Sequence, residues 1–430
     1  MTKITLRVSV LVFVFALVCA QAAAQTAAQP QVTAIRAGRL VVPETGAVLT
    51  NQIILVEGTR IKAVGPDVAI PQGATVIDLS GRTVLPGLFA CHEHMAFLIN
   101  AKGQERGSLF FYDLTSTNSM RAIHAVVNSR DMLDSGFTTI RDLGNDANYV
   151  MTDLRRAVDQ GLIPGPTVIN SGRIIAPFGG QYQLQPERRH LGEPEYFYAD
   201  TRDEMRKAIR ENVHFGARVI KIVVDDQRYI YSADDIRFMI AEAAAANVKL
   251  AAHCVTEQGA RNAAEAGVAS IEHGFEMSDE VIALAKKNNV ALVGTDFTEK
   301  AWLAYQMPAE LAKRLHARSV DRLRRAHKIG LTMAFGSDLI FYAPDETRGT
   351  WTMSQIESLV EADIPAKDIL RMMTTNAALL LGVEKTRGSI APGLFADIVA
   401  VPENPLENIS TLKRVSFVMK NGKVIKNANR

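Results

Sequence analysis

The chain has 430 residues, of which 47% are hydrophobic and 22% are charged, so it is long enough to bury a large core and to form more than one structural unit. Its 48 basic and 46 acidic residues give a formal net charge of +2 without a run of one sign. This balance argues against a nucleic-acid or polyanion partner and favours a small-molecule substrate.

The N-terminus has the layout of a secretory signal. Two basic residues precede an apolar run over residues 8–18, and small residues up to Ala24 follow. This order predicts a signal peptide over residues 1–24 and an exported protein, periplasmic or secreted, without membrane contact after cleavage. The run is shorter than the about 20 residues of a membrane span. An uncleaved anchor and a lipoprotein site at Cys19 are the alternatives.

The mature chain keeps Cys91 and Cys254, each directly beside a histidine. Two cysteines do not make a disulfide framework, even in an exported protein. We expect both thiols to be free and buried.

The two ends of the mature chain share a β-rich pattern. Short β-rich runs separated by turns fill residues 31–82, and the same style returns in residues 388–430, with a hairpin around Asn421-Gly422. We therefore expect a small discontinuous β-sandwich domain that encloses a central insertion over residues 83–387.

The insertion alternates apolar strand-like runs with Ala-rich helical segments, for example "ARVIKIVVDD" before "ADDIRFMIAEAAAAN". This alternation is typical of an α/β fold, either a (β/α)8 TIM-like barrel or a doubly wound sheet. The positions of the polar residues decide between the two.

Two histidines interrupt the apolar run "LPGLFACHEHM". His92 and His94 are two residues apart, so in a strand both side chains point to the same face and can bind one metal ion. Core packing is the alternative for this short motif.

Lys221 lies within the apolar run "VIKIVV", where an unpaired ammonium is costly. Either a carboxylate such as Asp225 or Asp226 pairs with it, or carbon dioxide carbamylates it and the new carboxylate bridges two metal ions. His253 and His273 close two later strand-like runs, one strand-helix unit apart.

Asp338 closes the apolar run "LTMAFGSDL", and a carboxylate at such a depth needs a cation or many hydrogen-bond donors; a helix N-cap is the alternative. All six polar residues sit at the C-terminal ends of predicted parallel strands, which is where a barrel has its active site. This agreement favours the barrel.

These motifs resemble the metal-dependent amidohydrolase superfamily, and the resemblance covers nearly the whole mature chain. It is closest to the branch of imidazolonepropionase-like proteins, Xaa-Pro dipeptidases and related hydrolases of dipeptides or N-acyl amino acids. The segments that carry it are "PGLFACHEH", "GFTTIRDLG", "GLIPGPTVINSG", "IKIVV", "AAHC", "IEHG", "GSD", "TTNAALLLG" and "GSIAPGLFADIVAV".

The resemblance implies a binuclear centre of two divalent ions, with zinc suited to the ligands. His92 and His94 would bind the more buried ion, His253 and His273 the more exposed one, carbamylated Lys221 would bridge them, and Asp338 would complete the buried site and act as the base. A hydroxide that bridges the ions would attack the amide carbonyl. Similar proteins that are deaminases or true imidazolonepropionases have one metal and no bridging lysine.

The chain departs from the family pattern at two positions. Ala90 stands where many relatives have an aspartate, and Gln181 follows Gly179-Gly180 where peptidase relatives often have a histidine. Because of these departures, a side chain that supports the first metal site is in doubt, and the substrate specificity of the peptidase relatives cannot simply be transferred to this chain.

For a substrate whose leaving group is an amino acid, Tyr231 is the candidate donor to the free carboxylate, with Arg189 and His190 as weaker ones. Aromatic residues in the loops favour a bulky or aromatic group, as in an ochratoxin-type amide. The alternatives are an esterase, lactonase or phosphotriesterase that uses the same site, and a non-catalytic metal-binding protein. Barrels of this branch commonly form homo-oligomers.

Overall fold

The structure of the protein, a computed structural model, describes residues 31–97, 109–341, 343 and 345–428. The predicted signal peptide, residues 1–24, lies outside these ranges. Within them, no helix is both long enough and apolar enough to cross a bilayer.

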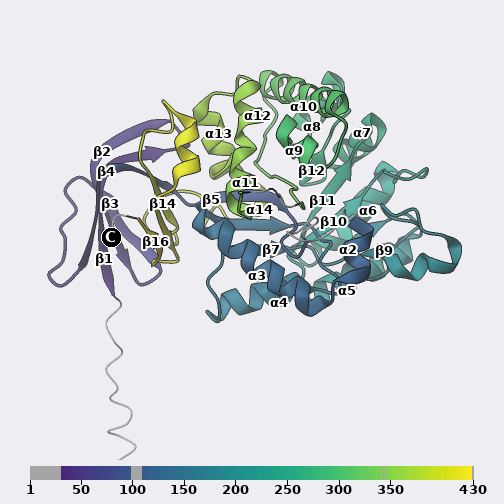
Figure 1. Cartoon of the computed structure of the whole chain (residues 1–430), viewed down its shortest axis with the longest axis horizontal. Coiled ribbons are helices and arrows are strands. Elements are labelled where there is room, and N and C mark those ends of the chain that lie inside the picture. Colours follow the sequence, from purple (N-terminus) through teal and green to yellow (C-terminus); the bar gives the residue numbers. More distant parts are fainter. Residues whose placement is uncertain (1–30, 98–108, 342, 344, 429–430) are drawn as a thin grey trace, which may run out of the picture.

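Both ends of the described chain contribute strands to one sheet, with the order β16-β15-β14-β4-β1-β2-β3. Figure 1 shows the purple N-terminal strands beside the yellow C-terminal ones. The join is antiparallel pairing of β14 with β4, in which Ile398 is opposite Pro86. The strands are β1 (Val32–Val42), β2 (Ala47–Glu57), β3 (Arg60–Gly65), β4 (Thr75–Pro86), β14 (Ile398–Val401), β15 (Phe417–Lys420) and β16 (Lys423–Asn427).

The central part of the chain forms parallel strands that alternate with helices. Its strands are β5 (Leu88–Glu93), β6 (Phe137–Asp142), β7 (Thr167–Asn170), β8 (Ile174–Ala176), β9 (Tyr196–Tyr198), β10 (Val219–Val223), β11 (Lys249–Cys254), β12 (Ser270–His273) and β13 (Ala291–Val293). All pairings among them are parallel, so their carboxyl ends lie at one edge.

An extended segment, residues 331–338, closes the barrel between β13 and β5. Met333 bridges to Leu292 in parallel, and the amide of Cys91 donates to the carbonyl of Phe335 at 2.7 Å. The close approach needs a glycine, because a Cβ at Gly336 would lie 2.7 Å from the Cβ of His92. The predicted barrel with an added β-domain is confirmed.

Helices cover the outside of the barrel. Thr201, Ser232, Thr256 and Ser278 cap four of them, α5 to α8, with side chains that accept from backbone amides, which is what fixes a helix start. The helices are α2 (Leu109–Thr115), α3 (Asn118–Asp134), α4 (Val150–Asp159), η1 (Pro186–Gly192), α5 (Arg202–His214), α6 (Ala233–Ala244), α7 (Glu257–Ala266), α8 (Asp279–Lys287), α9 (Glu299–Ala304), α10 (Ala309–Ile329), α11 (Arg348–Ser354), α12 (Ile356–Glu361), α13 (Ala366–Met372), α14 (Thr375–Leu381) and η2 (Ile409–Arg414).

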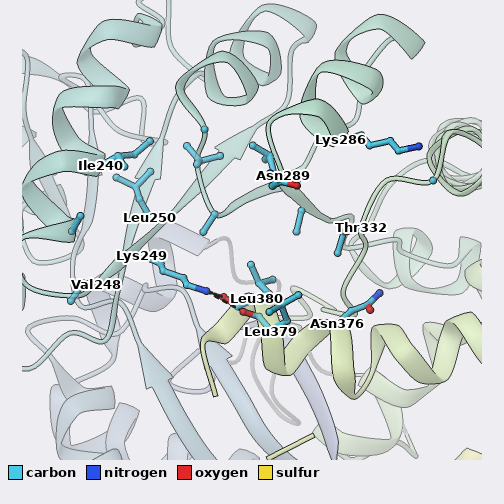
Figure 2. Close-up of a pocket in the computed structure, with 17 residues that line it drawn as sticks. Ile240, Val248, Lys249, Leu250, Lys286, Asn289, Thr332, Asn376, Leu379 and Leu380 are labelled. Carbon is cyan, nitrogen blue, oxygen red and sulfur yellow. Dashed lines mark hydrogen bonds between the residues drawn. The ribbon is translucent and has the colours of Figure 1, made fainter. Parts of the chain in front are cut away.

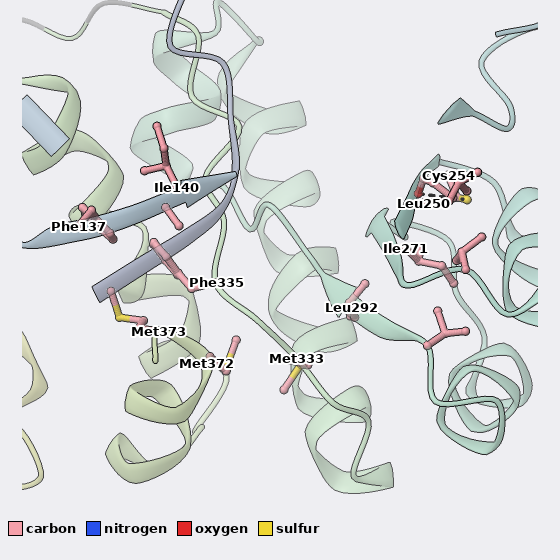
Figure 3. Packing of buried hydrophobic residues seen from close by; sticks show 14 of the residues in the cluster. Phe137, Ile140, Leu250, Cys254, Ile271, Leu292, Met333, Phe335, Met372 and Met373 are labelled. Carbon is pink, nitrogen blue, oxygen red and sulfur yellow. Dashed lines mark hydrogen bonds between the residues drawn. The ribbon is translucent and has the colours of Figure 1, made fainter. Parts of the chain in front are cut away.

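The largest apolar cluster fills the space between the barrel strands and their helices. Figure 3 shows Ile271 and Leu292 of neighbouring strands within it, and Phe335 of the closing segment stacked on Phe137. Because such strands are buried on both faces, any charged residue on them requires a specific partner or role.

A pocket of about 750 Å³ lies at the amino ends of the strands (Figure 2). Its lining includes Lys249, the first residue of β11, and Ala291, the first residue of β13. His253, one of the histidines predicted to bind metal, is at the opposite end of β11, so this pocket is separate from the predicted metal site.

Candidate metal centre

The four predicted histidines gather at the carboxyl end of the barrel. The ring centroids of His92 and His94 are 5.3 Å apart, those of His92 and His273 are 5.0 Å apart, and those of His253 and His273 are 4.4 Å apart. All four are buried. Strand register explains the closest pair, since Cys254, the neighbour of His253, is directly opposite His273.

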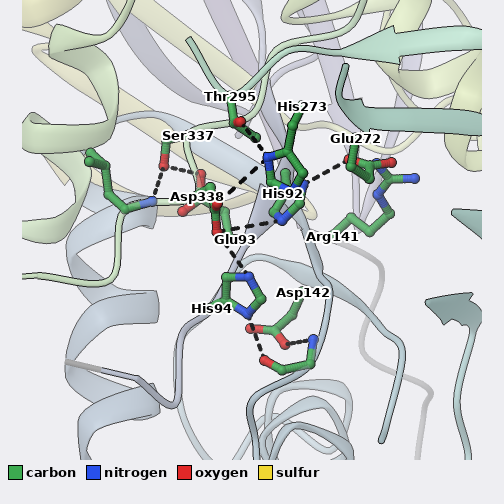
Figure 4. A network of polar contacts seen from close by, with 12 residues as sticks. His92, Glu93, His94, Arg141, Asp142, Glu272, His273, Thr295, Ser337 and Asp338 are labelled. Atoms are coloured by element: carbon green, nitrogen blue, oxygen red, sulfur yellow. Dashed lines mark hydrogen bonds and ion pairs between the residues drawn. The ribbon is translucent and has the colours of Figure 1, made fainter. Parts of the chain in front are cut away.

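Asp338 reaches into this cluster from the closing segment (Figure 4). Its Oδ1 lies 3.0 Å from Nε2 of His94 and 3.5 Å from Nε2 of His92, and its Oδ2 lies 3.8 Å from Nδ1 of His273. One ligand atom from each of His92, His273 and Asp338 falls within a 4.8 Å group that could hold a metal ion. Two of these residues come from strands that are not adjacent in sequence, so only the closed barrel brings them together.

A buried carboxylate orients His92. Nδ1 of His92 lies 2.8 Å from Oε2 of Glu272, and Arg141 donates to the other oxygen of Glu272 at 2.7 Å. When Nδ1–H of His92 donates a hydrogen bond to Glu272, the lone pair of Nε2 faces Asp338. This is the arrangement in which a histidine binds a metal and its other nitrogen is hydrogen-bonded to a carboxylate.

His94 and His273 have the same arrangement with other acceptors. Nδ1 of His94 lies 2.7 Å from the carbonyl oxygen of Gly144, and Nδ1 of His273 lies 2.8 Å from Oγ1 of Thr295. The Thr295 hydroxyl itself donates to the carbonyl of Gly294 at 2.8 Å, so it accepts from the imidazole. Both rings therefore leave Nε2 available as a ligand atom.

Lys221 is 2% exposed, on β10. Its Nζ makes no hydrogen bond or ion pair with any described residue, so neither Asp225 nor Asp226 pairs with it. Burial lowers the pKa of Lys221 to about 8, against the raising effect of Glu272 and Asp338. A neutral buried amine is the form that reacts with carbon dioxide.

The protonation states suit a cation. Burial, followed by the charge of Lys221, lowers the pKa of His92 well below its usual value, and burial together with His253 does the same for His273. Burial would raise the pKa of Asp338, but His92 and His94 lower it to about 2. Burial opposes it, but the Asp338 carboxylate raises the pKa of His94, so His94 gives up a proton when it binds a metal. Neutral imidazoles beside an ionised carboxylate are the states in which these groups bind a metal.

Several residues at the same place have a left-handed backbone conformation. His273 has φ 65°, Thr295 φ 49°, Asp338 φ 55° and Asp226 φ 92°, values that residues other than glycine adopt rarely. Such conformations persist at functional sites because the surrounding structure holds them.

At the two positions where the sequence departs from the family pattern, the structure shows what polar contacts are present instead. Ala90 is fully buried and offers no polar group, but Glu272 supplies a carboxylate to His92. Gln181 donates to Oδ2 of Asp226 at 2.9 Å. Arg141, Glu272 and Asp226 were not assigned from the sequence. Only the position of Glu272 beside His273, and of Arg141 near a strand end, could have indicated the first two.

The structure places Tyr231, the first of the predicted substrate-binding residues, in the apolar core and not at this cluster. The hydroxyl of Tyr231 donates to the carbonyl of Ala199 at 2.7 Å, and the residue is 5% exposed within the main core. The chain turns back after β10, where the amide of Tyr231 donates to Val224, and this turn directs the ring inward. Arg189 and His190 are exposed on η1.

Both cysteines of the described chain, Cys91 and Cys254, are free and buried, as predicted.

The amidohydrolase family model matches residues 83–425, which include all the residues of this cluster. The chain belongs to the amidohydrolase family. A hydrolase that acts on amide bonds is the activity this membership supports, and divalent metals are general in the family.

Three relatives narrow the comparison. The chain is 27% identical to ochratoxinase of Aspergillus niger. The alignment is 440 residues long and covers 93% of this chain and 87% of that protein. It is 28% identical to imidazolonepropionase of Symbiobacterium thermophilum, over 82% of this chain and 84% of that one. The crystal structure of a Xaa-Pro dipeptidase with methionine in its active site superposes with a TM-score of 0.80 at 27% identity, over 92% of this chain and all of that chain.

Proposed function

We propose that the protein is a binuclear metal-dependent amidohydrolase that cleaves the amide bond of a dipeptide or an N-acyl amino acid. The observation that carries this proposal is the ionised carboxylate of Asp338 among His92, His94 and His273, whose nitrogens lie 3.0 to 3.8 Å from its oxygens. Imidazole and carboxylate ligands suit zinc, although other first-row ions accept them too.

The proposed second ion depends on Lys221. A carbamate on its Nζ would supply two oxygens between the His92–His94 pair and the His253–His273 pair. Support comes from burial, from the absence of a partner within the described chain, and from the pKa of about 8.

When bound, two divalent ions lower the pKa of a water to about 7 and polarise a substrate carbonyl. The residues of the chain perform the remaining steps. Asp338 accepts the proton of the attacking water on a carboxylate oxygen and then donates it to the amine that leaves. Glu272 holds His92, and the buried surroundings exclude bulk water. The products are a carboxylic acid and an amine.

The substrate pocket is proposed to be aromatic. The ring of Phe275 lies 5.5 Å from that of His273 and 6.3 Å from that of Trp302. Tyr305 is 39% exposed, and its ring meets that of Trp302 edge-on at 6.3 Å and lies 5.4 Å from that of Phe341. After burial, the charges of Asp338 and Asp226 raise the pKa of Tyr305.

Aromatic walls favour bulky amides. The ochratoxinase relative makes ochratoxin-type N-acyl-phenylalanine amides one candidate class, and the Xaa-Pro dipeptidase relative makes dipeptides the other. A panel that contains both classes, with metal content measured on the same sample, tests the proposal. We expect about two metals per chain and amide cleavage that disappears in Asp338→Asn.

Other outcomes would point to another function. Cleavage of a lactone, an ester or a phosphotriester alone would favour the alternative hydrolases, and metal binding without any hydrolysis would favour a metal-binding protein. We also propose that the protein is exported and forms a homo-oligomer. N-terminal sequencing of the mature protein and its mass in solution test these two points.

A further inference from the structure

Asp226 lies against one of the proposed metal ligands. Its Oδ2 is 2.7 Å from Nε2 of His253, and its side chain is 27% exposed. His253 is 7% exposed, and its Nε2 is a buried polar atom without a hydrogen-bond partner among the described residues. The two atoms therefore form a close ion pair, and Nε2 has no further partner in the described chain.

Two atoms that approach so closely can also become ligand atoms of one ion. Zinc binds nitrogen and oxygen at about 2.0 to 2.2 Å, usually in tetrahedral geometry, so two of its ligand atoms lie about 3.4 Å apart. The distance of 2.7 Å between Asp226 Oδ2 and His253 Nε2 is shorter, so these two atoms would move apart by about 0.7 Å to accept an ion between them. Asp225, Asp226 and His253 also form a group whose ligand atoms lie within 4.8 Å of one another.

The two aspartates of that group, Asp225 and Asp226, make different contacts. Asp225 is 1% exposed and accepts from the amides of Val255 and Thr256 at 2.8 and 2.9 Å and from the Thr256 hydroxyl at 2.7 Å. These bonds hold the start of α7, so Asp225 is structural. Asp226 makes no such backbone contacts in the described chain and faces His253.

The loop after β10 holds Asp226 in place. Gln181 donates to Oδ2 of Asp226 at 2.9 Å, and Gln227 donates to the carbonyl of Gly180 at 2.6 Å, so the two loops are tied together. The backbone of Asp226 has φ 92°, where glycine would be unstrained. An aspartate at such a position costs stability, which agrees with a role for its carboxylate.

We propose that Asp226 is a further ligand of the exposed metal ion, which His253 and His273 also bind. The inference rests on the proposed binuclear centre. It adds a negative charge to the exposed site and gives that ion a protein carboxylate of its own, as Asp338 does for the buried ion. Gln181, in the loop that differs from the peptidase relatives, would position this carboxylate.

The test is metal affinity of the full mature chain, measured by zinc titration against a chelator after the metal has been removed. We expect wild-type protein to bind two ions, and Asp226→Asn to bind the first ion normally and the second at least tenfold more weakly. Asp226→Gly should behave in the same way while its metal-free form melts at no lower temperature than wild type, because glycine accepts the backbone angle. Asp234→Asn removes an equal charge from the exposed start of α6 and should bind both ions as wild type does.

Equal affinity for the second ion in wild type and Asp226→Asn would overturn the inference. If Asp226→Asn then also had a raised KM only for substrates with a free amino group, Asp226 would be assigned to substrate binding. If wild type itself bound at most one ion and cleaved no amide, the proposed function would fail instead. The two failures are therefore distinguishable.

Discussion

Glu272 connects Arg141 to His92 inside the barrel. Its Oε1 accepts a hydrogen bond from Arg141 at 2.7 Å, and its Oε2 lies 2.8 Å from Nδ1 of His92. Arg141 also donates to the hydroxyl of Ser270 at 2.9 Å. All these groups are buried, so the orientation of His92 is fixed before any ligand binds.

Glu272→Gln should weaken the buried metal site. The glutamine amide cannot accept from both Arg141 and His92, because one of its two polar atoms is a donor. Loss of such a partner typically lowers metal affinity about 10–100-fold. Chelator competition measures the loss, and Glu265→Gln on the exposed face of α7 is the matched control. Unchanged affinity would show that Glu272 does not act through His92.

Asp338→Asn should lower kcat for amide hydrolysis by about 10²- to 10⁴-fold, the range for a lost general base. Asparagine keeps the shape but cannot accept the proton. Metal content must be measured on the same sample, since Asp338 also faces the ligands. Asp321→Asn, 61% exposed, is the control. A variant with full metal content and unchanged kcat would exclude Asp338 as the base.

Metal uptake should depend on bicarbonate if Lys221 is carbamylated. Metal-free wild-type protein should bind its second ion faster and more tightly when bicarbonate is added, because carbon dioxide supplies the bridging carboxylate. Lys221→Met should show no such dependence, and Lys207→Met, on an exposed face of α5, should behave as wild type. Bicarbonate-independent uptake in wild type would contradict the bridge.

Lys420 should make stability depend on pH in the alkaline range. It lies 2.8 Å from Asp397 and from the hydroxyl of Thr167. Burial lowers its pKa to about 8, although Asp397 opposes this. Between about 8 and the ordinary lysine value of 10.5, the unfolded chain binds a proton that the folded chain does not, so stability rises with pH.

The comparison for this pH effect is Lys420→Met. Relative to that variant, the free energy of unfolding of wild type should rise by at most about 1 kcal/mol per pH unit between the two pKa values. The unfolding midpoint in urea at several pH values measures the gain, and Lys423→Met, which is exposed, should track wild type. A parallel dependence in Lys420→Met would assign the effect to other groups.

The two described thiols should resist modification. Burial raises the pKa of Cys91 to about 12 and also raises the pKa of Cys254, so neither thiolate forms at neutral pH. A thiol reagent should react with both only after denaturation, and rapid labelling of the folded protein would contradict the buried positions.

The sequence was sufficient to predict the barrel and to place the four histidines at or just after the ends of its strands, whereas Lys221 lies in the middle of β10 and Asp338 at the end of the closing segment. Parallel strands carry their carboxyl ends to one edge, so His92, Lys221, His253 and Asp338 could be placed together without coordinates. Strand spacing also placed His273 beside His253, because consecutive parallel strands are neighbours.

Contacts that depend on three-dimensional packing were not predictable. The pairing of Glu272 with His92 joins residues 180 positions apart, and nothing in either motif specifies it. The inward position of Tyr231 depends on a turn, and the approach of Asp226 to His253 depends on a backbone angle that its residue type disfavours. Local patterns indicate strand ends, whereas these contacts depend on barrel closure or on loop paths.

The pairing of β14 with β4 has a consequence for synthesis of the chain. The ribosome completes β4 long before Ile398–Val401 emerge, so one edge of an apolar strand stays uncovered during most of translation. β4 leads through Gly87 directly into β5, which carries His92. A premature stop before β14 would therefore leave a chain that has most of its barrel, but with an unpaired, aggregation-prone strand edge beside its metal-binding strand.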